Sequence, residues 1–288
     1  MDALCSAFRR LNNAMQTMER PAVAPVHPSR RPAPWPVEFY RSAVGKKWVM
    51  ALTGIGLMGY VFVHMLGNLK LFVGAEDINH YGEWLRTLLV PFFPRTVTLW
   101  LLRIGLIFAF VFHIHAAYSL TMMNRRAQAR GGYVSKRDWQ AATAASRSMR
   151  LTGIVILLFV VWHLSDLTWG WVNPDFERGD VFRNVVASFQ RPPIALLYIV
   201  ANIALGIHLF HGAWSMFQSL GLNNPKWNSW RRSFAIGFAA LVTVGNLSFP
   251  IAVMTGVIDA DDNPDCEVRG DTIVTCELYE TEAGGENE

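Results

Sequence analysis

The segment WVMALTGIGLMGYVFVHMLGNL, Trp48–Leu69, decides the class of fold. It runs without a single Asp, Glu, Lys or Arg. A helix needs about 20 apolar residues to cross the hydrocarbon core of a bilayer. Backbone polar groups in lipid need partners within their own segment, so such a span folds as a helix. The segment therefore predicts a transmembrane helix, and it begins too late in the chain to be a cleavable signal peptide.

Four more segments have the same character. Ile104–Asn124, Pro192–Pro225 and Ser233–Ile258 carry no charged residue, and Leu151–Asn173 carries one acid, Asp166. The whole chain is 17% charged and 52% hydrophobic, whereas soluble domains are about a quarter charged. We therefore predict an all-α integral membrane bundle of five transmembrane helices. The expected spans are about 48–72, 97–124, 150–173, 193–219 and 232–257.

Basic residues gather in three segments: before the first span, between spans two and three, and between spans four and five. Together these hold 18 of the 26 Lys and Arg residues, and five spans place all three on one side. By the positive-inside rule the N-terminus is cytoplasmic and the C-terminus lies outside. Residues 259–288 hold eleven of the 22 acids and one base. The net charge of +4 and the basic pI therefore indicate membrane topology and not a nucleic-acid partner.

The predicted membrane domain covers residues 38–258, and the parts of the chain outside it are small. Residues 1–37 form a Pro- and Arg-rich leader, predicted to be flexible and cytoplasmic, and residues 259–288 form an acidic tail outside the cell. The stretch Asp77–Leu89 predicts a short amphipathic helix on the outer face. No dinucleotide fingerprint, phosphate loop, nucleophile elbow or internal repeat is evident, and no catalytic domain fits in the remainder.

Histidines are the informative side chains, because ionisable groups within a membrane are costly and usually functional. Six of the eight lie in the spans. A rise of about 1.5 Å per residue places one histidine from each of spans one and three in the outer half of the bilayer, and one from each of spans two and four in the inner half. A second histidine in spans two and four lies about one turn deeper. The outer residues are His64 and His163, the inner ones His115 and His211, and the deeper ones His113 and His208.

Two histidine pairs at two depths predict two bis-histidine haems stacked across four helices, because neutral imidazole is a good axial ligand of haem iron. His113 and His115 are two residues apart and face nearly opposite ways, so only one of them can be a haem ligand on a given face of the helix. His208 and His211 share a face, which leaves one of them for a propionate, a quinone or a neighbouring helix. The alternative for any single histidine is a hydrogen bond between helices.

A [2Fe–2S] centre with two His and two Cys ligands is the chemical competitor. Cys5, Cys266 and Cys276 all lie outside the spans, so this cluster would need Cys from a partner or from a folded-back tail. Cys266 and Cys276 fall on the oxidising side, where they form either a disulfide or a plain surface pair.

An ordered set of motifs runs along the chain: FYRSAVGKKWVMALTG (Phe39–Gly54), FVHMLGNLK (Phe62–Lys70), INHYGEWLR (Ile78–Arg86), HIHAAYSLTMMNRRA (His113–Ala127), SRSMRLTG (Ser146–Gly153), WHLSDLTWG (Trp162–Gly170) and HLFHGAWSMFQSLGLNNP (His208–Pro225). Over residues 38–256 the chain resembles the single-chain, five-helix cytochrome b membrane anchors of bacterial succinate dehydrogenases and fumarate reductases.

This resemblance implies that His64 and His163 bind a distal haem b. The HAAYSL and HGAWSMF contexts favour His115 and His211 for a proximal haem b, with His113 and His208 as alternates. It also implies a flavoprotein and an iron–sulfur protein docked on the cytoplasmic face, and quinone, with menaquinone as the suited type, in the plasma membrane of a bacterium. Succinate chemistry would then lie in a partner subunit, and the complex could form a homo-oligomer.

Polar residues at the inner interface are candidates for the quinone site, or are simple interfacial anchors: Ser42, Lys46 and Arg147. Asp166 follows His163 by three residues and shares its face, which suits a proton relay, a ligand contact or an interfacial acid.

Two other functions compete with an electron-transfer anchor. The first is a di-haem cytochrome of another respiratory enzyme, such as a formate dehydrogenase or hydrogenase. The second is a transporter or structural protein that uses its histidines for packing.

Overall fold

The computed structural model describes residues 33–129, 144–222, 224–259, 266–269 and 272–276. It divides at Arg41 into two units, which we describe separately. In the first unit, helix α2 (Trp35–Arg41) begins where the carbonyl of Pro34 accepts hydrogen bonds from the amides of Val37 and Glu38 at 2.9 and 3.2 Å. Pro36 stands in its first turn, where the missing amide proton costs nothing. This helix was not expected from the sequence, because its proline-rich composition predicted a flexible leader up to residue 37.

The second unit holds five helices that are each long and apolar enough to cross a membrane, which confirms the predicted all-α membrane fold. Large apolar side chains on these helices are widely exposed, as lipid-facing side chains are. The chain is therefore a multi-pass membrane protein. The five helices are α3 (Ala43–Asn68), α5 (Val97–Ala129), α6 (Ala144–Leu167), α8 (Pro192–Ser219) and α9 (Asn228–Met254).

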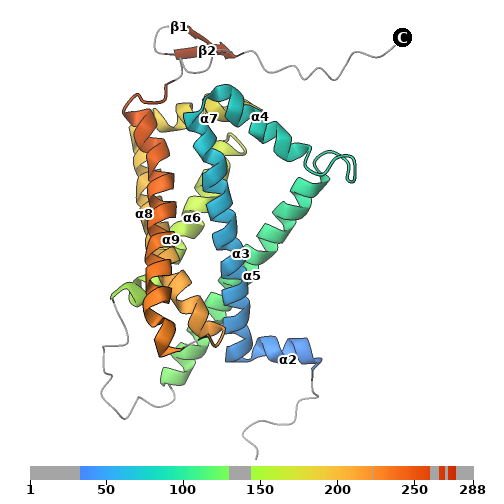
Figure 1. Ribbon diagram of the computed structural model, residues 1–288, viewed down its shortest axis with the longest axis vertical. Coiled ribbons are helices and arrows are strands. Elements are labelled where there is room, and N and C mark those ends of the chain that lie inside the picture. Colours follow the sequence, from blue (N-terminus) through green and yellow to red (C-terminus); the bar gives the residue numbers. More distant parts are fainter. Residues whose placement is uncertain (1–32, 130–143, 223, 260–265, 270–271, 277–288) are drawn as a thin grey trace, which may run out of the picture. The chain divides into compact units, whose positions relative to one another are not determined.

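Helix α8 is central to the packing, because it contacts α3, α6 and α9, while α5 packs chiefly on α3 (Figure 1). Small residues allow this close approach. A Cβ added at Gly206 of α8 would overlap Oγ1 of Thr243 on α9, whose hydroxyl donates to the carbonyl of Ala239 at 2.7 Å. Glycines at such contacts are typical of membrane helix pairs.

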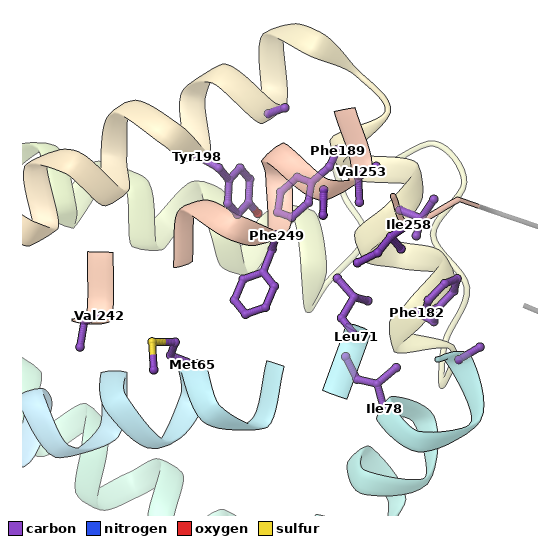
Figure 2. Packing of buried hydrophobic residues seen from close by; sticks show 14 of the residues in the cluster. Met65, Leu71, Ile78, Phe182, Phe189, Tyr198, Val242, Phe249, Val253 and Ile258 are labelled. Carbon is purple, nitrogen blue, oxygen red and sulfur yellow. The ribbon is translucent and has the colours of Figure 1, made fainter. Parts of the chain in front are cut away.

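Two short helices close one end of the bundle: α4 (Ala75–Arg86), which follows the 3-10 turn η1 (Leu69–Phe72), and α7 (Val181–Phe189). The helix predicted at residues 77–89 is confirmed as α4, whereas α7 was not foreseen. The Asn79 side chain joins them, accepting from the amides of Val181 and Phe182 at 2.8 and 3.1 Å. Figure 2 shows the apolar cluster beneath, in which Leu71 and Ile78 pack with Phe182 and with residues of α8 and α9.

The acidic tail contains a two-stranded antiparallel hairpin, β1 (Cys266–Arg269) and β2 (Thr272–Cys276), which the sequence analysis missed. Its register places Cys266 directly opposite Cys276. The leader residues 1–32, including Cys5, and most of the basic loop between α5 and α6 lie outside the described residues.

Candidate redox site

Four histidines stand at two levels of the bundle, in matched positions. His64 and His163 each lie four residues before the last residue of their helices, α3 and α6. His113 and His208 each lie sixteen residues after the first residue of theirs, α5 and α8. We call His64 with His163 the first pair, near the α4–α7 end, and His113 with His208 the second pair.

Each pair faces across the bundle with its rings at a defined separation. The ring centroids are 6.0 Å apart in the first pair and 6.4 Å apart in the second. Two imidazoles on opposite sides of one metal ion have centroids about 6 Å apart, because each metal–nitrogen bond is about 2 Å and each ring nitrogen lies about 1.2 Å from its centroid. Both pairs therefore have a ring separation that would suit two histidines binding one metal ion between them.

The second pair has its ring protons fixed by neutral acceptors. Nδ1 of His113 lies 3.2 Å from the carbonyl oxygen of Met50 and 3.3 Å from Oγ1 of Thr53. Because a carbonyl can only accept, Nδ1 carries the proton and Nε2 keeps the lone pair that a metal needs. Nδ1 of His208 likewise lies 3.2 Å from Oγ1 of Thr152. Both threonine hydroxyls also donate to their own helix backbones, so each oxygen is left to accept.

This symmetry reflects a sequence repeat that the sequence analysis missed. Met-x-Leu-Thr-Gly occurs at residues 50–54 of α3 and again at 149–153 of α6. Each copy supplies the threonine that contacts a histidine of the second pair and the glycine that lies beside that histidine's ring. A Cβ built on Gly54 would stand 3.4 Å from Cε1 of His113, and one on Gly153 would stand 3.5 Å from Cε1 of His208. The repeat is only five residues long, much shorter than a repeated structural unit.

The first pair has a different environment. Tyr60 stacks on His64 with ring centroids 5.4 Å apart, and Nδ2 of Asn68 lies 3.5 Å from His64 Nε2, at the limit of a hydrogen bond. Nδ1 of His163 lies 3.4 Å from Oη of Tyr198, which also contacts the buried Asp166.

His115 and His211, the two residues that the motif contexts favoured, lie in different surroundings. His115 is exposed on α5, two residues along from His113 and on another face. His211 is buried against Phe210, with ring centroids 4.7 Å apart, and its Nε2 has no hydrogen-bond partner within the described part of the chain.

The three quinone candidates have separate environments. Ser42 caps α3, its hydroxyl accepting from the amide of Gly45 at 2.9 Å. Lys46, one turn further along α3, is buried with 9% of its surface exposed. Arg147 belongs to α6, but its side chain lies outside the described residues.

The chain is similar in sequence to known membrane subunits of one enzyme class. Residues 122–247 match the family model described as succinate dehydrogenase/fumarate reductase transmembrane subunit. The chain is therefore similar to membrane subunits of these enzymes. It is 25% identical over 173 residues to the succinate dehydrogenase cytochrome b558 subunit of Bacillus subtilis, covering 60% of this chain and 77% of that protein. No solved structure matches the chain. The resemblance expected from the motifs is thus confirmed.

Proposed function

We propose that the chain is the membrane anchor and electron-transfer subunit of a succinate:quinone oxidoreductase. The observation that carries the proposal is the presence of two facing histidine pairs at two levels of one helix bundle. The family relationship supplies the enzyme class. Succinate chemistry would take place in a flavoprotein subunit, and an iron–sulfur subunit would pass electrons to the anchor.

Haem b fits both pairs. In the described part of the chain no three His, Cys, Asp or Glu residues gather into a metal site. A haem needs only two protein ligands, because the porphyrin supplies the other four nitrogens. We assign one haem to His64 and His163, and the other to His113 and His208 in place of His115 and His211. Haem b, when bound, accepts and donates one electron at a time.

The chain's own residues would prepare the ligands. Met50, Thr53 and Thr152 hold the Nδ1 protons of the second pair, so that each Nε2 presents its lone pair. Gly54 and Gly153 let the rings lie close to the neighbouring helix. Buried His211 lies one turn from His208, and its Nε2 is suited to hydrogen-bond a polar edge of the bound group.

We propose a cytoplasmic N-terminus, which would place the second pair nearer the cytoplasmic face. Helix α3 begins beside Lys46 and Lys47, and the other helix ends on this side carry Arg125, Arg126 and Arg150. An iron–sulfur subunit docked there would reach the second pair first. Thr53 and Thr152, which contact the second pair, each lie eleven residues before the first-pair histidine of their own helix. This step corresponds to roughly 16 Å along a helix.

A quinone site at this same face remains part of the proposal, with Lys46 as its main polar residue. Ser42 already serves as the cap of α3, so its hydroxyl has a structural role. The burial of Lys46 on a membrane helix favours a specific role over simple anchoring at the interface.

The decisive experiment is a haem count on the purified complex. We expect a dithionite-reduced minus oxidised spectrum of cytochrome b type and two haems b per chain by pyridine haemochrome. A flavoprotein and an iron–sulfur subunit should co-purify, and succinate should reduce both centres. A chain without haem, a low-temperature paramagnetic signal of a His-ligated [2Fe–2S] cluster, or a molybdenum or nickel partner would each contradict the proposal.

The threonines of the two Met-x-Leu-Thr-Gly copies give a further prediction. The double variant Thr53→Val and Thr152→Val keeps side-chain shape but removes both hydroxyl acceptors. We expect haem retention at the second pair to weaken by about tenfold, the usual effect of losing the hydrogen-bond partners of a metal ligand. The measurement is haem occupancy after dilution into excess apomyoglobin. Thr121→Val is the matched control, because that hydroxyl bonds only back to Ala117 of its own helix among the contacts found.

A further inference from the structure

A buried carboxylate stands behind one histidine of the first pair. Asp166 of α6 is fully buried, one helical turn after His163. Its Oδ1 pairs with Nη2 of Arg191 at 2.9 Å. Its Oδ2 accepts hydrogen bonds from Oη of Tyr198, at 2.9 Å, and from Oγ of Ser188. Such a group is costly in a membrane protein, so its presence calls for a role.

Tyr198 connects this carboxylate to the histidine. The tyrosine hydroxyl has one proton, and Asp166 accepts it, because an ionised carboxylate can only accept. The lone pairs of Oη therefore remain for Nδ1 of His163, 3.4 Å away. His163 must then carry its proton on Nδ1 and keep the Nε2 lone pair for a metal.

The position of Tyr198 is fixed by its neighbours. It is 4% exposed, and its ring is packed edge-to-face against Phe159 and Phe189, with centroids 5.0 and 4.8 Å apart. Figure 2 shows Tyr198 and Phe189 together in the apolar cluster. The Tyr198 side chain is already ordered by this packing. Its hydroxyl oxygen therefore faces His163 with no further loss of Tyr198 conformational entropy when a ligand binds.

The two pairs therefore differ in electrostatics. The ring protons of the second pair meet neutral acceptors, the carbonyl of Met50 and two threonine oxygens. The ring proton of His163 meets a hydroxyl that is polarised by a carboxylate. A polarised acceptor makes the imidazole a stronger electron donor, which stabilises oxidised iron and lowers the reduction potential.

We propose that Tyr198, with Asp166 behind it, is a positioning residue that fixes the ring proton of His163 and lowers the reduction potential of the centre held by the first pair. The inference rests on the proposed haem ligation by His64 and His163.

The test is a redox titration of the purified complex carrying Tyr198→Phe, followed optically and by electron paramagnetic resonance. We expect the reduction equilibrium of the first-pair centre to shift by roughly tenfold toward the reduced form, which is about 59 mV for a one-electron couple. The second-pair centre should be unchanged. Asp166→Asn should shift the same centre in the same direction by a smaller factor.

Tyr60→Phe is the matched control, since Tyr60 contacts the other histidine of the pair through its ring, which the substitution keeps. It should move neither potential. The assignment of the two centres comes from His64→Ala and His208→Ala. If both haems are present and correctly assigned, but Tyr198→Phe and Asp166→Asn leave both potentials unchanged, this inference is wrong while the proposed function stands. A wild-type complex without haem would overturn the function itself.

Discussion

His208→Ala should reduce the haem content from two per chain to one, whereas His211→Ala should leave two. The two residues are three positions apart on one face of α8, His208 half-buried and His211 buried, so sequence alone hardly distinguishes them. The ring of His208 faces His113 with centroids 6.4 Å apart, and its Nδ1 is held by Thr152. Nε2 of His211 has no hydrogen-bond partner in the described part of the chain.

Helix α5 provides the reciprocal comparison. His113→Ala should remove the same centre as His208→Ala, and His115→Ala should leave it intact, since His115 is exposed. The measurement is a pyridine haemochrome count with a redox titration to show which centre is lost. The opposite result would be loss of a haem in His211→Ala or His115→Ala while His208→Ala and His113→Ala keep both haems. It would show that the haem ligands are those favoured by the motif contexts, and that the ring geometry misidentified them.

Arg191→Ala should have the largest effect on stability among changes outside the histidine pairs. Its guanidinium pairs with Asp166, which is fully buried, and donates to the carbonyl of Val172 at 2.9 Å. Removing one partner leaves a buried charge uncompensated, which costs about 3–5 kcal/mol. We expect a clear fall in the thermal unfolding midpoint of the detergent-solubilised complex, with loss of order first where α6, α7 and α8 meet.

Two comparison variants make this prediction specific. Lys70→Ala breaks an ion pair with Asp77 in which both side chains are over 40% exposed, so it should cost at most about 1 kcal/mol. Adding Asp166→Asn to Arg191→Ala should recover part of the loss, because the isolated charge is then gone. Equal effects of Arg191→Ala and Lys70→Ala, or a further loss in the double variant, would contradict the account of a buried pair.

The physical link between these two predictions is the position of the first pair. Asp166 is bound by Arg191 of the segment before α8 and by Tyr198 of α8, and it lies one turn from His163. An ion pair that holds α6 to α7 and α8 therefore also supports a proposed haem ligand. Stability and redox tuning at this end of the bundle should respond to the same residues, while the second pair should be insensitive to them.

Much of the molecule was predictable from local patterns. Uncharged stretches such as Trp48–Leu69 require a helix wherever they meet lipid, so five spans and an all-α fold followed directly. Helix α4 was predictable because its twelve residues place apolar side chains on one face and polar side chains on the other. Helix α7 was not, because it has only nine residues and depends on Asn79 and the apolar cluster beneath it. The tail hairpin also gave no clear signal, since its strands have four and five residues.

The sequence by itself determined that histidines from four helices stand at two levels, because depth in a membrane depends only on the count of residues along a straight helix. It also determined that His64 and His163 share one level. Only the tertiary structure decided which histidine of each neighbouring pair faces a histidine of another helix at the other level. That choice depends on the rotation of α5 and α8 about their axes, which is set by contacts with Gly54, Thr53, Gly153 and Thr152 on other helices. The sequence separation between residues on different helices does not reveal which of them face each other. That becomes known only once the helices are packed together.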